Sequence, residues 1–207
     1  MHIPDGFIPI TQCIIYAIIT IILLGVMYYK TGKKNISERS IPLIAMFIVA
    51  VIIIQYINIP LPFVACTHIS LIAFLALYDP WIATVVLAFA VFIQGIFLGE
   101  GGITTMGADM LNTAIIGPTV AYVVYNISKN KLNNKISIFL AAFLSVTIVG
   151  IAAAIELYIA GIYPLELGLT LIAGTEAIVG IVEGIITVFL MLALNKIKPE
   201  LVPVLNS

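Results

Sequence analysis

The chain has 207 residues, of which 62% are hydrophobic and only 9% are charged, and its formal net charge is −1. Soluble domains are about half apolar and about a quarter charged, so this composition excludes a water-soluble globular protein and places the chain in a lipid bilayer. The net charge gives no support to nucleic-acid binding, and two cysteines are too few for a disulfide framework.

Seven apolar segments follow one another along the chain, and each predicts a transmembrane helix. A helix of about 18–20 residues covers about 30 Å, the thickness of the hydrocarbon layer, and satisfies its own backbone hydrogen bonds there. The third segment is short, and Asp79-Pro80 predicts a tight break before the fourth. The predicted spans are residues 12–29, 40–58, 63–78, 81–98, 112–128, 136–160 and 171–194.

Basic and acidic residues lie at opposite ends of these predicted spans. All nine Lys and Arg residues fall after the first, fifth and seventh spans, and seven spans place these three segments on one side. The positive-inside rule makes that side cytoplasmic. We therefore expect an all-α integral membrane protein, a seven-helix bundle with an extracellular N-terminus and a cytoplasmic C-terminus. The opposite side carries acidic residues, namely Asp5, Glu100, Asp109 and Glu166.

Several glutamates lie within the predicted spans, where ionisable residues are costly and normally face the interior of the bundle. Glu176 and Glu183 are seven residues apart and share one helical face, while Gly180 and Gly184 allow another helix to approach closely. We interpret Glu176 and Glu183 as protonated or paired groups in interhelical hydrogen bonds. A direct role in metal binding is the alternative. Glu156 lies within the sixth predicted span.

The two histidines, His2 and His68, are candidate ligands for a divalent metal ion. The Met1 amine and the His2 main-chain nitrogen can close a five-membered chelate ring, and that nitrogen and His2 Nδ1 can close a six-membered ring. A nitrogen from His68 would complete a planar set, which suits Ni²⁺ and Cu²⁺ and is also compatible with Co²⁺. Ca²⁺ and Mg²⁺ prefer oxygen ligands. The alternative is that both histidines are ordinary packing residues, and Cys66 is an alternative ligand.

The predicted topology brings the two histidines to the same side of the membrane. No Lys or Arg precedes the first apolar run, so we expect no secretory signal and a retained Met1. Pro4, Gly6 and Pro9 favour an irregular segment that folds into the bundle. The amine and imidazoles must lose their protons to bind metal, so affinity is expected to fall in acid.

Four polar residues are candidates for supporting this site. Asp5 is expected to orient His2 or to hold the inserted segment, Gln94 and Asn112 could hydrogen-bond the same segment, and Thr67 adjoins His68. The chain contains no phosphate-binding loop and none of the common hydrolase motifs, which predicts a protein without catalytic activity of its own. A standalone metal channel or carrier is one alternative, and an intramembrane enzyme that uses the buried glutamates is another.

Four stretches of the sequence resemble one known family. They are MHIPDGF at the start, the histidine-bearing segment 65–70, QGIFLGEGGITTMGADMLN at 94–112 and EAIVGIVEGIIT at 176–187. Together they resemble the CbiM/NikM family, the substrate-binding subunits of energy-coupling-factor transporters for cobalt and nickel. The family more often has Asp at the position of Glu100 and Asn at that of Asp109, and its usual Gly-Thr-Ser-like run is replaced here by Ala65-Cys66-Thr67.

The resemblance implies both a ligand set and a set of partners. It implies that Met1, His2 and His68 bind Co²⁺ or Ni²⁺ as substrate, with no resident cofactor. It also implies a membrane coupling subunit, a pair of ATP-hydrolysing subunits and a small accessory membrane subunit. The chain is then a single transmembrane substrate-binding domain, residues 1–207, with a chelating segment (1–11), seven helices (12–194) and a cytoplasmic tail (195–207).

Overall fold

The protein is described here by a computed structural model that covers residues 2–32, 40–60 and 66–202, with the main chain alone for residues 31, 32, 58–60 and 66. Within these ranges the chain forms seven helical segments and one two-stranded sheet. Five segments are long and apolar enough to cross a membrane: Ile10–Lys30, Pro80–Leu98, Met106–Ser128, Asn134–Ile159 and Leu165–Ile197.

Four of these five long segments combine α-helix with a wider π-helical turn, a feature that is often found near functional sites. The two remaining segments are short helices, α3 (Ser40–Gln55) and α4 (Ile72–Tyr78). In chain order the long segments are α1 (Ile10–Met27) with η1 (Tyr28–Gly32), α5 (Pro80–Ile93) with η2 (Gln94–Leu98), α6 (Met106–Met110) with η3 (Leu111–Ile116) and α7 (Gly117–Ser128), α8 (Asn134–Ile159), and α9 (Leu165–Gly168) with η4 (Leu169–Ala173) and α10 (Gly174–Ile197).

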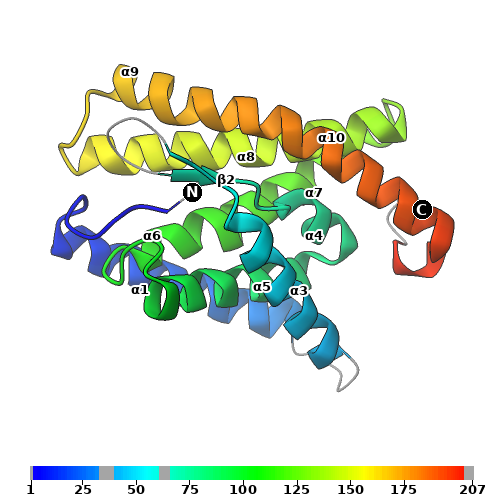
Figure 1. Cartoon of the computed structure of the whole chain (residues 1–207), viewed down its shortest axis with the longest axis horizontal. Coiled ribbons are helices and arrows are strands. Elements are labelled where there is room, and N and C mark those ends of the chain that lie inside the picture. The colour runs from blue at the N-terminus through cyan, green and yellow to red at the C-terminus, as the bar shows by residue number, and fades with distance from the viewer. Residues whose placement is uncertain (1, 33–39, 61–65, 203–207) are drawn as a thin grey trace.

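The long helices form two groups on either side of the N-terminal segment (Figure 1). α8 and α10 lie antiparallel along one side, and α1, α5 and α6 lie along the other. Between them are the strands β1 (Asn58–Pro60) and β2 (Cys66–His68), which pair antiparallel with Asn58 opposite His68. After α10 the described chain ends in a short 3₁₀ turn, η5 (Pro199–Leu201).

Two glycines of α10 let it pack closely against α8. A Cβ atom at Gly180 would lie 2.9 Å from the main-chain oxygen of Phe143, and one at Gly184 would lie 2.6 Å from the ring of Phe139. Helices in membranes use small residues in this way, because close packing replaces the hydrophobic driving force that water supplies elsewhere. The spacing of these glycines predicted the close approach.

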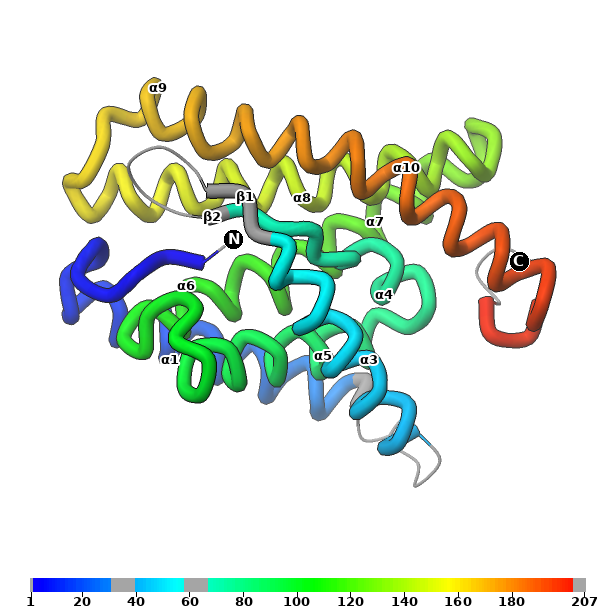
Figure 2. Tube along the Cα trace, viewed as in Figure 1, coloured from blue at the N-terminus to red at the C-terminus, as the bar shows by residue number. Residues whose placement is uncertain are grey.

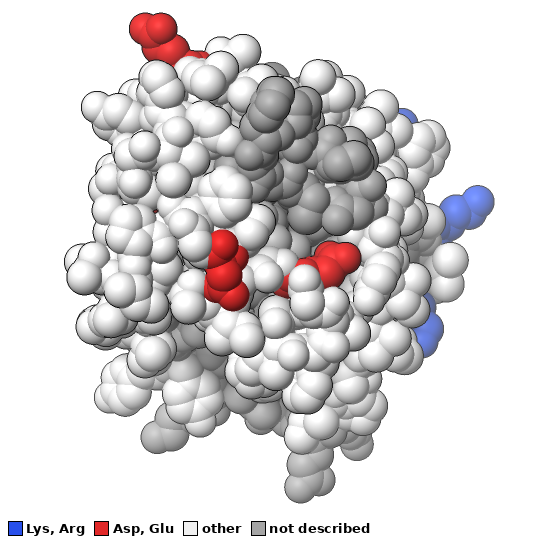
Figure 3. All heavy atoms as spheres, turned by 60° about the vertical axis from the view of Figure 1, so that its left-hand side comes forward, with Lys and Arg blue, Asp and Glu red and all other residues white. Residues whose placement is uncertain are grey.

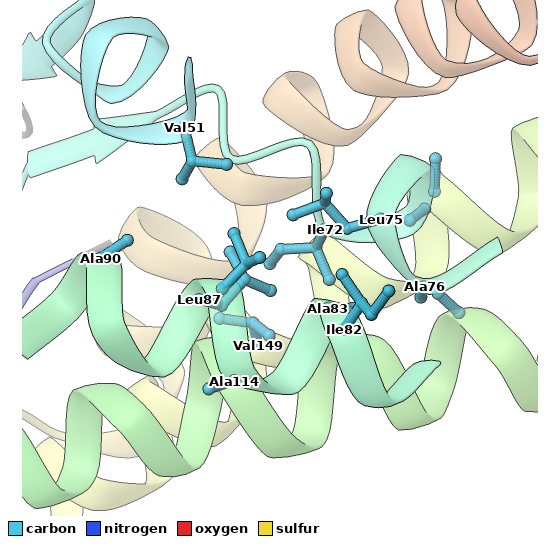
Figure 4. Close-up of a cluster of buried hydrophobic side chains, with 14 residues drawn as sticks. Val51, Ile72, Leu75, Ala76, Ile82, Ala83, Leu87, Ala90, Ala114 and Val149 are labelled. Atoms are coloured by element: carbon cyan, nitrogen blue, oxygen red, sulfur yellow. The ribbon is translucent and has the colours of Figure 1, made fainter. Parts of the chain in front are cut away.

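The core between α3, α4, α5, α7 and α8 is filled by small and branched apolar side chains. Figure 4 shows Ile72 of α4 directed toward Leu87 of α5, with Ala114 and Val149 completing the contact from two further segments. Val51 of α3 covers the cluster from the other side. These contacts fix α4 next to α5, and α4 in turn positions the strand that carries His68.

The third predicted span, residues 63–78, is wrong. Its helix covers only Ile72–Tyr78, about 10 Å in length, and follows strand β2 and a turn in which Leu71 has a φ of +53°. Residues 61–65 lie outside the described chain. Apolar composition alone cannot separate a buried strand and short helix from a full span, because both are rich in the same residues.

The break between the third and fourth segments is confirmed. Asp79 is extended, and its Oδ1 accepts the main-chain N–H groups of Trp81 and Ile82, each at 2.8 Å, so it caps α5 while Pro80 opens the helix. The fifth predicted span began too late. Its helix starts at Met106 and includes residues 106–111, which lay between the fourth and fifth predicted spans.

Charges lie at opposite ends of the bundle. Figure 3 shows the end of the bundle that carries the N-terminal segment and α9. Acidic side chains are scattered over this surface, and basic side chains appear only at its right-hand edge. The basic residues of the described chain lie near the ends of α1, α7 and α10 and at the start of α8, at the other side of Figure 1: Lys30, Lys129, Lys131, Lys135, Lys196 and Lys198. This separation is the pattern expected of a protein with a fixed orientation in the membrane.

Candidate metal centre

The N-terminal segment enters the interior of the bundle. Figure 2 shows it running inward from the start of α1 to a position beside β2. His2 is only 1% exposed and Ile3 is fully buried, although both stand at the beginning of the chain. Ile3 and Ile8 pack in one apolar cluster with residues of α6 and α8, such as Ala108 and Leu157. Apolar burial therefore helps to hold the segment in place.

The imidazole rings of His2 and His68 meet at the end of this segment. Their centroids are 4.8 Å apart with an angle of 42° between the ring planes, and each residue is only 1% exposed. Within the described chain neither ring nitrogen of His2 has a hydrogen-bond partner. Buried polar atoms are rarely left unpaired, so this ring is a candidate for binding a ligand.

Asp109, from α6, holds the residue next to His2. Its Oδ1 and Oδ2 accept the main-chain N–H of Ile3 at 3.0 and 3.2 Å. Its Oδ2 also lies 3.5 Å from His2 Nδ1, too far for a good hydrogen bond. The hydroxyl of Thr105 donates to the carbonyl of Ile3. Sequence reasoning placed Asp109 on the outer side of the membrane and gave it no role at the site.

Asp5 holds the segment nearer the surface. Its carboxylate accepts the main-chain N–H of Thr104 at 2.8 Å and that of Ile103 at 3.1 Å, together with the Thr104 hydroxyl. The hydrogen bond from this hydroxyl is the main reason that the pKa of Asp5 lies below its usual value. Asp5 thus ties the segment to the loop before α6, the second of the two roles expected of it.

Two glycines let that loop approach the segment. Gly101 has a φ of +82°, and a Cβ there would lie 3.1 Å from both His2 Cβ and Asp109 Oδ2. A Cβ at Gly102 would lie 2.4 Å from Asp5 Oδ1. The contact at Gly102 is closer than real Cβ atoms show, and at Gly101 a tight contact adds to a backbone conformation that other residues rarely adopt. The loop that contains Gly101 and Gly102 therefore packs directly against the N-terminal segment.

The other predicted supporting residues are buried, but they do not all reach the segment. Asn112 donates to Glu156 Oε2 at 2.8 Å, a hydrogen bond between two helical segments. Gln94 is fully buried, and neither of its amide atoms has a hydrogen-bond partner within the described chain. Thr67 is fully buried beside His68. Met1 and the side chain of Cys66, both considered as ligands, lie outside the described residues.

The donor set here is limited. Among the described residues, no three His, Cys, Asp or Glu side chains are grouped so that they could hold a metal ion. A metal held beside His2 and His68 would therefore need nitrogen donors from the main chain or the terminal amine as well. Two imidazoles and main-chain nitrogens are ligands for a transition metal, not for Ca²⁺ or Mg²⁺.

Comparison with known proteins identifies the family. The family described as the cobalt uptake substrate-specific transmembrane region, CbiM, matches residues 2–201. This chain belongs to the CbiM family. It is 33% identical over 208 residues to the cobalt transport protein CbiM of Lachnoclostridium phytofermentans, an alignment that covers 94% of this chain and 82% of that protein. The family resemblance of the sequence is thereby confirmed.

Further relatives include a nickel protein and a solved structure. The chain is 30% identical over 221 residues to the fused nickel transport protein NikMN of Rhodobacter capsulatus, covering 97% of this chain and 63% of that protein. The crystal structure of a transition metal transporter matches with a TM-score of 0.88 at 28% identity, covering 95% of this chain and 93% of that one. As a CbiM protein, the chain is a multi-pass membrane component of cobalt or nickel uptake and not an enzyme.

Proposed function

We propose that this CbiM protein captures Co²⁺ or Ni²⁺, as the substrate, with the Met1 amine, the main-chain nitrogen and Nδ1 of His2, and one imidazole nitrogen of His68. The observation that carries the proposal is the buried contact between the rings of His2 and His68, in which the ring nitrogens of His2 have no hydrogen-bond partner within the described chain. A metal ion bound to Nδ1 would satisfy one of these two atoms.

The main chain around His2 supports the chelate. Asp109 and Thr105 bind the N–H and the carbonyl of Ile3, so the direction of the chain just after His2 is fixed. The ring of His2 has no hydrogen bond to break and can turn Nδ1 toward a metal at its own main-chain nitrogen. Nitrogen donors in a plane suit Ni²⁺ and also serve Co²⁺, so the same site accommodates either metal.

The direction of transport follows from the distribution of charge. We place the N-terminal segment and the acidic end of the bundle outside the cell, and the Lys-bearing end in the cytoplasm. Metal then binds from outside and the segment closes over it. A membrane coupling subunit, two ATP-hydrolysing subunits and a small accessory membrane subunit complete the transporter, since this chain lacks a phosphate-binding loop of its own.

Calorimetric titration of the purified protein, with its natural N-terminus, tests the ligand set. We expect one equivalent of Ni²⁺ or Co²⁺ to bind wild type, no binding of Mg²⁺, and a loss of more than about 100-fold in affinity for His2→Ala and for His68→Ala, because each removes a donor rather than a supporting contact. Binding by His68→Ala within about twofold of wild type would contradict the proposal.

A further inference from the structure

A buried glutamate of helix α10 contacts the turn that follows the histidine strand. Glu183 is fully buried, and its Oε1 accepts the main-chain N–H of Ser70 at 2.5 Å. The side-chain oxygen of Ser70 lies 3.1 Å from His68 Nδ1 and 3.3 Å from the carbonyl oxygen of His68. A continuous set of polar contacts therefore runs from α10 to the imidazole of His68.

The turn that follows β2 explains why a carboxylate is needed at this place. The chain reverses between His68 and α4, and Leu71 adopts a left-handed conformation that residues other than glycine rarely take. Ser70 lies within this buried turn, and its main-chain N–H needs an acceptor from another part of the chain. Glu183 satisfies it, and the N–H of Leu71 faces the same carboxylate.

The two contacts of the Ser70 hydroxyl define one arrangement of protons in which each donor has an acceptor. His68 Nδ1–H donates to Ser70 Oγ, and the Ser70 hydroxyl donates to the carbonyl of His68. In that arrangement the proton of a neutral imidazole is on Nδ1, and Nε2 carries the lone pair that a metal needs. Groups that fix the tautomer and orientation of a metal-binding histidine typically control metal affinity.

We propose that Ser70 and Glu183 are positioning residues for His68: Ser70 fixes the imidazole with Nε2 toward the metal, and Glu183 fixes Ser70 from α10. This inference rests on the proposed function, because it assumes that His68 is a ligand. It adds that α10, the helix that packs along α8, is connected directly to the metal site. A displacement of α10 relative to β2 would therefore weaken the hold of His68 on the metal.

Two pairs of variants of equal shape test the proposal. Ser70→Thr keeps the hydroxyl and Ser70→Val replaces it with a methyl group, so both add the same bulk. Glu183→Gln keeps an acceptor for the Ser70 N–H, and Glu183→Met removes it at similar length. Thr187→Val is the control, since Thr187 lies one turn further along α10 and is equally buried. Each protein is titrated with Ni²⁺ by calorimetry, and its thermal unfolding is measured without metal.

We expect Ser70→Val and Glu183→Met to bind Ni²⁺ about 10–100-fold more weakly, and Ser70→Thr and Glu183→Gln to retain most of the affinity. The visible absorption of bound Ni²⁺ should change in Ser70→Val and not in Thr187→Val, which a general loss of stability would not produce. Affinities of Ser70→Val and Glu183→Met within about twofold of wild type would overturn the inference. If they occurred while His68→Ala lost binding, the proposed function would stand and this inference alone would fail.

Glu183→Met leaves a buried N–H unpaired and risks misfolding. In that event the Ser70 pair decides, because its two members share a shape and neither alters α10. Equal affinity of Ser70→Thr and Ser70→Val would overturn the role of the hydroxyl, and a deficit confined to Ser70→Val would support it.

Discussion

Both carboxylate oxygens of Asp109 accept the main-chain N–H of Ile3, at 3.0 and 3.2 Å. This contact joins residues more than 100 positions apart and fixes the chain immediately after His2, the residue on which the proposed chelate depends. Because both partners are buried, the N–H of Ile3 has no water to replace Asp109 if the carboxylate is removed.

Replacement of Asp109 should therefore weaken metal binding. We expect Asp109→Leu to lower Ni²⁺ affinity by about 10–100-fold, since it leaves the N–H of Ile3 unpaired and frees the main chain beside His2. Asp109→Asn keeps one acceptor oxygen and should lose less. Titration calorimetry of the two variants measures the difference, and equal affinities for both variants and wild type would show that Asp109 does not position the segment.

A side chain at Gly102 should displace the N-terminal segment. Its Cβ would lie 2.4 Å from Asp5 Oδ1 and 2.6 Å from the main-chain nitrogen of Asp5, so the segment must move away. We expect Gly102→Ala to bind Ni²⁺ more weakly by at least about tenfold, comparable to other losses of support around a metal. Gly25→Ala is the matched control, because no atom lies within 4 Å of its added Cβ. An unchanged affinity for Gly102→Ala would contradict this prediction, because the loop would then have moved in place of the N-terminal segment.

The hold of Asp5 on the segment should depend on pH. Hydrogen bonds from Thr104 lower the pKa of Asp5 below its usual value, so the ionised carboxylate stabilises the folded segment above that usual pKa. The contribution is lost as pH falls through the lowered pKa. Asp5→Asn should thus melt below wild type near about pH 7, and the gap should close below about pH 4. Glu166→Gln, an exposed acid on α9, is the control, and a gap independent of pH would contradict this role for Asp5.

Packing of α10 against α8 should be sensitive to Gly180. A Cβ there would lie 2.9 Å from the main-chain oxygen of Phe143, which cannot move without its helix. We expect Gly180→Ala to lower the free energy of unfolding by about 1–3 kcal/mol, the usual effect of overpacking. Gly174→Ala serves as the control, since its nearest contact would be an ordinary 3.8 Å. Thermal unfolding in detergent compares them, and equal melting temperatures would show that the helices separate easily.

The sequence was sufficient to predict most of the membrane helices. Long apolar runs such as residues 136–160 match α8 closely, because a lipid environment leaves a helix as the favoured form for them. The segment around His68 was mispredicted because this argument does not apply to it. There the surrounding protein, not lipid, satisfies the backbone: Glu183 binds the N–H of Ser70, and a contact 113 residues away leaves no trace in local composition.

The candidate site was predictable in part. The nearness of His2 and His68 follows from the predicted topology, since both residues belong to the same end of the bundle. The roles of Asp109 and Ser70 could not be predicted, because each depends on the exact turn at which its helix or strand ends. Asn112 was expected beside the N-terminal segment, but it binds Glu156 of α8 because the helix begins earlier than the apolar pattern indicated.

The central claim, that the N-terminal amine is a metal ligand, is tested most directly by adding a single residue before Met1. The extension moves the amine out of the chelate and leaves every other side chain unchanged. We expect calorimetry to show one equivalent of Ni²⁺ bound to the natural protein and a loss of more than about 100-fold in affinity for the extended one. Equal binding by the two proteins would contradict the account, because the amine would then not be a ligand.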